Sequence, residues 1–192
     1  MPAKSTDRRI QRTRALLQEA LVSMIIEKGY EATTVQDIID RANVGRSTFY
    51  AHYADKQTLL ASGLDGLRRY LAEHQARAPR GEHGPSLGFS LAMVEHAAGH
   101  VELYRAIAGK ESGAYVMQRL HRTIAELVRK DLEGLGVRPA QRELCVQFVT
   151  GAFMGVLTWW MEQGARQPPA EVDVLFRGLV TNGLADVLGP PA

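Results

Sequence analysis

Apolar positions along this chain recur at intervals of three and four residues. The first clear example is Leu17, Ala20, Leu21, Met24 and Ile25, which together form one stripe of a helix. Similar spacing continues through nearly the whole chain, and no run alternates apolar and polar residues as a half-buried strand would. The pattern therefore predicts an all-α protein of about nine helices.

Glycine, proline and asparagine separate the expected helices. Gly29 and Asn43 stand at two of the breaks, where each can adopt the positive φ that a tight turn or helix end needs. The expected helices span approximately residues 9–28, 33–42, 44–50, 56–74, 87–98, 100–108, 112–133, 140–163 and 170–188.

Polar residues at two helix starts indicate how those helices are capped. Thr33 and Gln36 fit the S/T-x-x-E/Q capping box, in which two side chains bond to free amides at the start of a helix. Asp55 is a good N-cap for the helix that begins at Lys56.

The segment 33–56, TTVQDIIDRANVGRSTFYAHYADK, carries the most information about function. Two short helices across a tight turn form a helix-turn-helix, whose second helix enters the major groove of DNA. Val44, Thr48 and Phe49 supply the underside of that helix and its flank. Arg46 is the residue able to make bidentate bonds to guanine O6 and N7.

Small and polar residues around Arg46 complete the expected DNA surface. Gly45 and Ser47 let the start of the helix approach DNA, and the hydroxyl, imidazole and ammonium groups nearby contact phosphates, which positions the protein without reading sequence. The expected DNA-contacting residues are Thr33, Thr34, Gly45, Arg46, Ser47, Thr48, Tyr50, His52, Tyr53 and Lys56.

The charge of the chain is concentrated near its beginning. The net charge is only +2 over 192 residues, but residues 1–14 hold five basic residues against Asp7 alone. Next to a helix-turn-helix, such a basic arm is expected to contact phosphate. The alternative is a solubilising tail. The basic residues of the arm are Lys4, Arg8, Arg9, Arg12 and Arg14.

Residues from about 12 to 60 resemble the N-terminal domain of TetR/AcrR-type transcriptional regulators. The shared segments are EKGYEATTV, QDIIDRANV and STFYAHYADKQTLL. The resemblance implies a homodimer that binds a palindromic operator, with a DNA-binding domain over residues 1–55 and a dimerisation and effector domain over residues 56–192. It implies the same ten DNA contacts. Asn43, Gly45 and Ser47 depart from the residues common in the family, so the operator sequence is not predicted.

The last two expected helices carry more apolar residues than one core face needs. Residues 140–163 place small Gly151 and Gly155 beside bulky side chains, and Trp159 and Trp160 lie about 100° apart, so they serve different faces. The final helix is apolar on more than one side, which indicates burial by a partner. We expect a four-helix bundle formed by the last two helices of each protomer. The alternative is that they only close the core of the monomer.

A small hydrophobic or aromatic effector is expected among the middle helices. Aromatic, methionine and histidine residues at helical spacing are the candidates for its pocket, although such residues more often form plain core. The candidate lining residues are Phe89, Met93, His96, Tyr104, Met117, His121, Phe153 and Trp160.

Few residues suggest any other chemistry. His96 and His100 have the i, i+4 spacing that can hold a metal, but no third ligand is evident, so neither a metal nor a cofactor is expected. The sequence contains neither a nucleophile–base spacing nor a phosphate loop, so an enzyme is not expected. Cys145, the single cysteine, is expected to be an inert buried thiol. No signal peptide or membrane span is predicted, so a cytoplasmic location is expected.

These features together predict a homodimeric repressor that a small effector releases from DNA. Effector binding is expected to shift the helix at 56–74 and so change the separation of the two recognition helices. One alternative is a ligand-free co-regulator or activator of the same fold that acts through a protein partner. Another is a helical metal-binding protein that uses His96 and His100.

Overall fold

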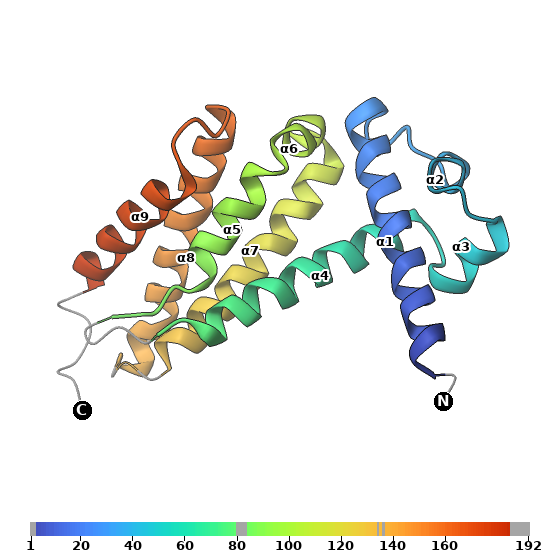
Figure 1. The fold of residues 1–192 in the computed structure, drawn as a ribbon. Coiled ribbons are helices and arrows are strands. Elements are labelled where there is room, and N and C mark those ends of the chain that lie inside the picture. Colours follow the sequence, from blue (N-terminus) through green and yellow to red (C-terminus); the bar gives the residue numbers. More distant parts are fainter. Residues whose placement is uncertain (1–2, 80–83, 134, 136, 185–192) are drawn as a thin grey trace. The chain divides into compact units, whose positions relative to one another are not determined.

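All regular secondary structure in the described part of the chain is helical, as the sequence predicts (Figure 1). The structure, a computed structural model, describes residues 3–79, 84–133, 135 and 137–184, and only the backbone of residues 3–7. Nine helices lie in this part: α1 (Ala3–Lys28), α2 (Val35–Ala42), α3 (Arg46–His52), α4 (Lys56–Arg77), α5 (Phe89–Ala98), α6 (Val101–Ile107), α7 (Glu111–Leu132), α8 (Pro139–Glu162) and α9 (Pro169–Leu184). The expected end of the last helix, at residue 188, lies outside the described residues.

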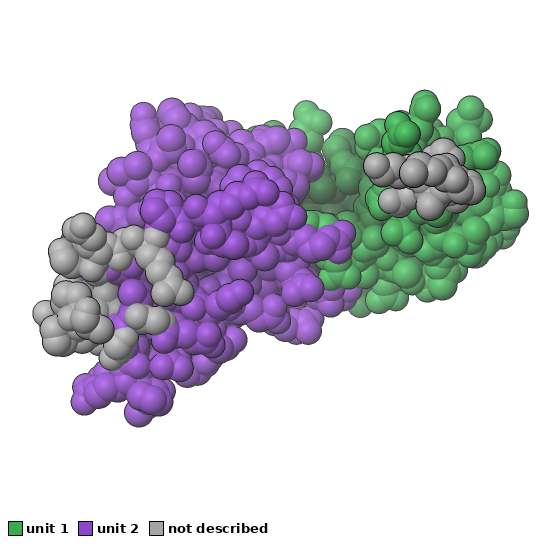
Figure 2. All heavy atoms as spheres, turned by 60° about the horizontal axis from the view of Figure 1, so that its bottom comes forward, with its two compact units in different colours: residues 1–66, 102–114 green, residues 67–101, 115–192 purple. Residues whose placement is uncertain are grey.

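The helices are grouped in two compact units (Figure 2). The first unit holds Met1–Gly66 and Glu102–Ala114, and the second holds Leu67–Val101 and Tyr115–Ala192. Helices α4 and α7 each begin in the first unit and continue into the second. The functional division into residues 1–55 and 56–192 stays a prediction.

The first unit is built around apolar side chains from four helices. Leu17 of α1, Ile38 of α2, Phe49 of α3 and Leu59 of α4 are completely buried. The rest of the predicted stripe on α1 is buried with Leu17. This burial stabilises α2 and α3 above all, because helices of eight and seven residues are marginal on their own.

Two left-handed residues end α1 and α2, as predicted. Gly29 follows α1 with φ of 87°, and Asn43 follows α2 with φ of 51°. The amide of Asn43 donates to the carbonyl of Asp40, and the next amide, of Val44, donates to Ile39. These bonds close the tight turn that sets the direction of α3.

The capping box of α2 lies one residue later than Thr33 and Gln36 predict. Thr34 is the N-cap: its hydroxyl accepts from the Asp37 amide at 3.2 Å, and the Asp37 carboxylate accepts from the Thr34 amide at 2.7 Å. The predicted pair was wrong because the Thr33 side chain turns into the interior. At the next helix, Asp55 caps α4 by accepting from the Thr58 amide at 2.6 Å, as expected.

Aromatic rings hold the core of the second unit. Phe153 of α8 packs edge-to-face against Phe89 of α5 at 5.2 Å and against Phe176 of α9 at 5.1 Å. Trp160 is completely buried and its indole N–H donates to the carbonyl of Gln167, whereas Trp159 is 49% exposed. The predicted division of the two tryptophans between different faces is therefore confirmed.

Helix α8 is more apolar than the rest of the chain. By length and composition alone it is able to cross a membrane, with a mean hydropathy of 1.5 over its most apolar window. Its inner side chains, which include Val149 and Phe153, are nevertheless buried in a unit where α8 contacts α5 and α9. We therefore interpret α8 as a core helix. Cys145 is buried on it as a free thiol, as expected.

Candidate nucleic-acid interface

Helix α3 turns an apolar side toward the core and a polar side outward. Phe49 is completely buried, whereas Arg46, Ser47 and Tyr50 are exposed. This separation follows from the helical period, because residues 47 and 50 point about 160° and 100° away from residue 49 around the helix axis. Gly45 is the exposed N-cap of α3 and makes no side-chain cap bond, as its missing side chain predicts.

The guanidinium of Arg46 lies over the ring of Tyr50, one helical turn later. Its central carbon is 5.7 Å from the ring centroid, within the range of a cation–π interaction. Among the residues that the structure describes, no carboxylate pairs with Arg46. The stack therefore supports a permanently charged, bidentate donor at the surface, where a guanine edge or a phosphate can reach it.

Three further residues that were predicted to contact DNA lie on α2 and α3. Thr34 is exposed at the start of α2, with its hydroxyl 2.5 Å from the Asp37 carboxylate. Thr48 and His52 are half-buried on α3. The Lys28 ammonium and the Thr34 groups hold the pKa of Asp37 well below its usual range, so Asp37 stays ionised and keeps Thr34 in place.

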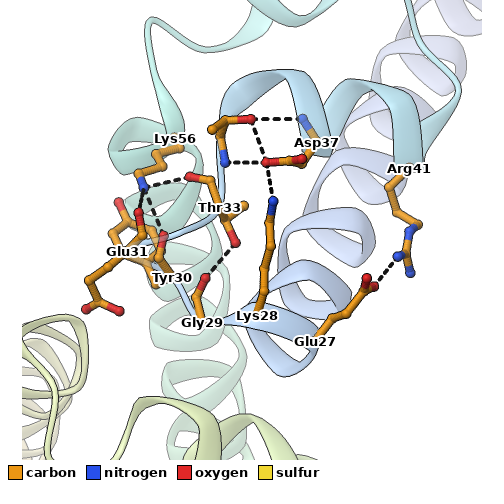
Figure 3. Close-up of polar contacts among 10 residues, drawn as sticks. Glu27, Lys28, Gly29, Tyr30, Glu31, Thr33, Asp37, Arg41 and Lys56 are labelled. Atoms are coloured by element: carbon orange, nitrogen blue, oxygen red, sulfur yellow. Dashed lines mark hydrogen bonds and ion pairs between the residues drawn. The ribbon is translucent and has the colours of Figure 1, made fainter.

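Thr33 is not available to DNA, contrary to its prediction. Its side chain is 1% exposed, and its hydroxyl donates to the carbonyl of Gly29 at 2.7 Å (Figure 3). The hydroxyl thus closes the loop between α1 and α2 instead of facing a phosphate.

Lys56 was also predicted to contact phosphate, and the structure turns its ammonium inward. Nζ donates to the carbonyls of Tyr30 at 2.8 Å, Thr33 at 2.7 Å and Glu31 at 3.3 Å, and it lies 4.5 Å from the centroid of the Tyr30 ring (Figure 3). All three of its N–H groups are used. The loop between α1 and α2 could have predicted this role of Lys56, because carbonyls outside regular helices need hydrogen-bond donors.

Tyr53 is the third predicted contact that the structure places elsewhere. Its side chain is buried, its ring lies 6.1 Å from that of Phe49, and its hydroxyl has no hydrogen-bond partner among the described residues. The ring is part of the core, so the hydroxyl does not face the DNA side of α3.

Replacing Tyr53 with phenylalanine is expected to raise the free energy of unfolding by about 1 kcal/mol, because it removes a buried hydroxyl that has no partner. Urea unfolding of the two proteins measures the difference. DNA affinity should stay unchanged. A drop in affinity would mean that the hydroxyl reaches DNA after all.

Two ion pairs that the sequence analysis missed attach α2 to α1. Lys28 contacts Asp37 at 2.6 Å, and Arg41 pairs with Glu27 (Figure 3). Arg41 also donates to the Ser23 hydroxyl. The partners of the Arg41–Glu27 pair lie 14 residues apart, so local spacing gives no signal for it.

The basic arm is helical, because α1 begins at Ala3. Arg9, Arg12 and Arg14 are exposed along it, as is Arg8. The side chain of Lys4 lies outside the described residues. Phosphate contact by these arginines stays a prediction.

Half of the predicted effector residues form packed core instead of lining a pocket. The side chains of Phe89, Met93, Phe153 and Trp160 are buried in the second unit, where the phenylalanine rings contact one another. Tyr104 belongs to the first unit. These four buried residues are part of the core, because their side chains fill the space that a ligand would need.

Met117 and His121 line a groove between α7 and α8. Its volume is about 770 Å³. The other lining residues are Gln118, Arg122, Met154, Gly155, Thr158, Trp159 and Glu162. Space for a ligand therefore lies along one side of α8, among residues that the sequence only partly identified.

His96 and His100 contact each other without forming a metal site that is complete among the described residues. Their rings stack at 4.2 Å, and Nδ1 of His100 donates to the carbonyl of His96 at 2.7 Å. Tyr70 of α4 lies 6.4 Å from His96. Within the described ranges no third histidine, cysteine or carboxylate completes a ligand set.

His96 makes the stability of the protein depend on pH. Burial, and secondly the nearby His100, lower its pKa from 6.5 to about 4. In the unfolded chain the imidazole takes up a proton below about pH 6.5, whereas in the folded protein it stays neutral. The contribution of neutral His96 to the free energy of unfolding is therefore complete above pH 6.5 and is lost as the pH falls toward 4.

His96→Gln should accordingly reduce the loss of stability between pH 7.5 and pH 5 by about 1–2 kcal/mol. Urea unfolding at the two pH values measures this difference, with His121→Gln as the control. Equal pH dependence in His96→Gln and the unmodified protein would contradict the assignment.

A short arginine-bearing helix that follows a left-handed turn and contacts the helix before it is typical of a helix-turn-helix DNA-binding protein. Two family models match the chain: bacterial regulatory proteins of the tetR family over residues 17–62, and the transcriptional regulator C-terminal region over residues 87–182. The chain belongs to the TetR family of transcriptional regulators.

Individual relatives agree with this assignment. The chain is 25% identical over 169 residues to YxbF, an uncharacterised HTH-type transcriptional regulator of Bacillus subtilis, which covers 86% of this chain and 44% of YxbF. It is 34% identical over 79 residues to the HTH-type transcriptional regulator TtgR of Pseudomonas putida, covering 41% of this chain and 37% of TtgR. The matched part thus spans less than half the length of either relative.

Solved structures show the same fold. A TetR transcriptional regulator from Streptococcus agalactiae is 24% identical with a TM-score of 0.60, covering 93% of this chain and 98% of that one. The regulator FadR from Bacillus subtilis, solved in complex with stearoyl-CoA, is 16% identical with a TM-score of 0.63, covering 88% and 98%.

Proposed function

We propose that this protein is a homodimeric repressor that binds a palindromic operator and leaves it when a small effector binds. The observation that carries the DNA-binding part is the exposed face of α3, where Arg46 lies over Tyr50. With Thr33, Tyr53 and Lys56 turned inward, the proposed contacts are Thr34, Gly45, Arg46, Ser47, Thr48, Tyr50 and His52.

These contacts divide into two kinds. Arg46 reads a guanine by bidentate hydrogen bonds, whereas the hydroxyls of Ser47 and Tyr50 donate to phosphates and fix the register of α3 on the duplex. The exposed arginines of α1 add sequence-independent attraction to the backbone, which weakens as salt concentration rises.

A homodimer is supported by large apolar side chains left uncovered on the last two helices. Leu144 and Phe148 of α8 are about half exposed or more, and so are three residues of α9: Val174, Leu175 and Leu179. A large uncovered apolar surface is unfavourable in water and typically marks an interaction site. We propose that the same two helices of a second protomer cover it.

Glycines on these helices support close packing against a partner. A Cβ added to Gly151 or Gly178 meets no atom within 4 Å among the described residues. Glycine inside a helix costs roughly 1 kcal/mol relative to alanine. Since no described neighbour needs the space, approach of a partner helix is a physical reason for keeping glycine there.

The groove between α7 and α8 is the proposed effector site. Met117, Met154 and Trp159 offer an apolar, polarisable lining, while Arg122 and Glu162 add charged groups. This lining suits a small aromatic compound with polar substituents. FadR, solved with stearoyl-CoA, is a protein of the same fold with a small molecule bound.

Release from DNA would follow from a change in the spacing of two recognition helices. A dimer reads two half-sites about one helical turn, roughly 34–36 Å, apart. Helix α4 continues from the first unit into the second, so a ligand that shifts it would change this spacing. This role places the protein in the cytoplasm, where it acts as a regulator and not as an enzyme.

In vitro selection from a random DNA library tests the proposal. The purified full-length protein should enrich a palindromic sequence, and sedimentation should show two protomers per site. A reporter under that operator then decides the sign of regulation, since a neighbour of this fold, DhaS, is described as an operon activator. Enrichment of no sequence would reject the proposed function, and increased reporter output would reject the repressor role.

A further inference from the structure

The loop between α1 and α2 is anchored from two distant parts of the chain. One anchor is Lys56, the first residue of α4, whose ammonium binds the three loop carbonyls described above (Figure 3). The other anchor is the start of α7. All of these residues belong to the first unit.

Glu31 connects the loop to α7. Its Oε1 accepts a hydrogen bond from the amide of Ser112 at 3.3 Å, so the carboxylate occupies the position of a helix cap. Hydrogen bonds from its own backbone and from Ser112, with the charge of Lys110, hold the pKa of Glu31 below its usual range. A negative charge at a helix start is also favoured by the helix dipole.

Lys110 adds a second contact at the same corner. Its Nζ lies 3.2 Å from the position that a Cβ on Gly29 would take. Glycine is required at position 29 by its left-handed φ of 87°, and the end of the Lys110 side chain lies beside it. The corner before α7 thus packs directly on the loop before α2.

Both anchoring helices lead into the second unit. Ser112 lies in the first turn of α7, and the first groove residue, Met117, follows five residues later on the same helix. In the other direction, Glu31 is only three residues before Thr34, the N-cap of α2. A displacement of the start of α7 therefore acts on the loop that positions the helix-turn-helix.

We propose that the Glu31–Ser112 contact is a regulatory link, through which α7 couples the groove to the DNA-binding helices in parallel with α4. The inference rests on the proposed function, because it assigns a route for effector control of the same DNA site. Coupling is reciprocal: if α7 controls DNA binding, DNA binding must change the start of α7. The link is therefore testable before any effector is known.

Hydrogen exchange of the full-length protein, with and without its selected operator, measures this coupling. In the unmodified protein, operator binding should slow exchange at residues 113–116 of α7 by about fivefold or more. In Glu31→Ala, which removes the acceptor, this slowing should disappear, while protection of α3 by DNA remains. Glu31→Asp should behave in the same way, because its shorter side chain withdraws the carboxylate from Ser112.

Glu19→Ala is the matched control, since it removes an exposed carboxylate of α1 in the same unit. In this control variant, operator binding should still slow hydrogen exchange at residues 113–116 of α7. If DNA protects α3 but not residues 113–116, or if Glu31→Ala keeps the full slowing, the link is wrong and the proposed function stands. If no operator binds at all, the proposed function and the link both fail.

Discussion

Arg46→Ala should lower the affinity of the protein for its operator by about 10- to 100-fold, and it should abolish the preference for the guanine that Arg46 reads. A bidentate arginine–guanine pair contributes roughly 1–3 kcal/mol of discrimination against the wrong base. Arg46 is exposed and stacked on Tyr50, so its removal leaves the buried side of α3 intact. Fluorescence anisotropy with the operator and with a scrambled duplex measures both effects.

The control for Arg46→Ala is Arg166→Ala, which removes one exposed positive charge from the α8–α9 connection. It should change operator affinity little. Equal losses for the operator and the scrambled duplex in Arg46→Ala would show that Arg46 binds only phosphate. An unchanged affinity would reject its role in DNA binding altogether.

Leu175→Glu combined with Leu179→Glu should convert the dimer into a monomer and lower operator affinity by at least about 100-fold. The two leucines are 68% and 71% exposed on α9, so the protomer itself does not depend on them. In the proposed four-helix bundle, each buried leucine contributes about 1.5–3 kcal/mol, and glutamate replaces that gain with desolvated like charges. Analytical ultracentrifugation measures the mass.

Ile26→Glu is the control for the interface variant, because Ile26 is an exposed apolar residue of α1 in the other unit. It should leave the dimer intact. A double variant that remains dimeric would place the interface on another surface. A monomer with full operator affinity would show that a single helix-turn-helix suffices for binding.

The positions of the helices along the chain could be predicted well, because apolar periodicity and helix-ending residues are local features of the sequence. The stripe that begins at Leu17 is buried as its spacing requires, and Asn43 takes the left-handed conformation that the turn needs. Phe49 and Tyr50 divide between core and surface because neighbouring residues on a helix point about 100° apart. The all-α fold and the family follow from such local patterns.

The candidate site was predicted only in part, because polar side chains choose among partners that sequence spacing does not reveal. Lys56 had a phosphate as its expected partner, yet three loop carbonyls lie within its reach. Thr33 and Tyr53 were expected outside and are buried. The aromatic residues proposed to line a pocket, such as Phe89 and Phe153, pack against each other instead.

The sequence by itself determined the helices, the turn before α3 and the exposed position of Arg46, since each depends on residues a few positions apart. The tertiary structure decided which polar groups remain available to DNA and where a ligand finds space. It also brought Glu31 to Ser112, 81 residues further along the chain. Such contacts depend on how distant segments pack, and helical periodicity carries no information about that packing.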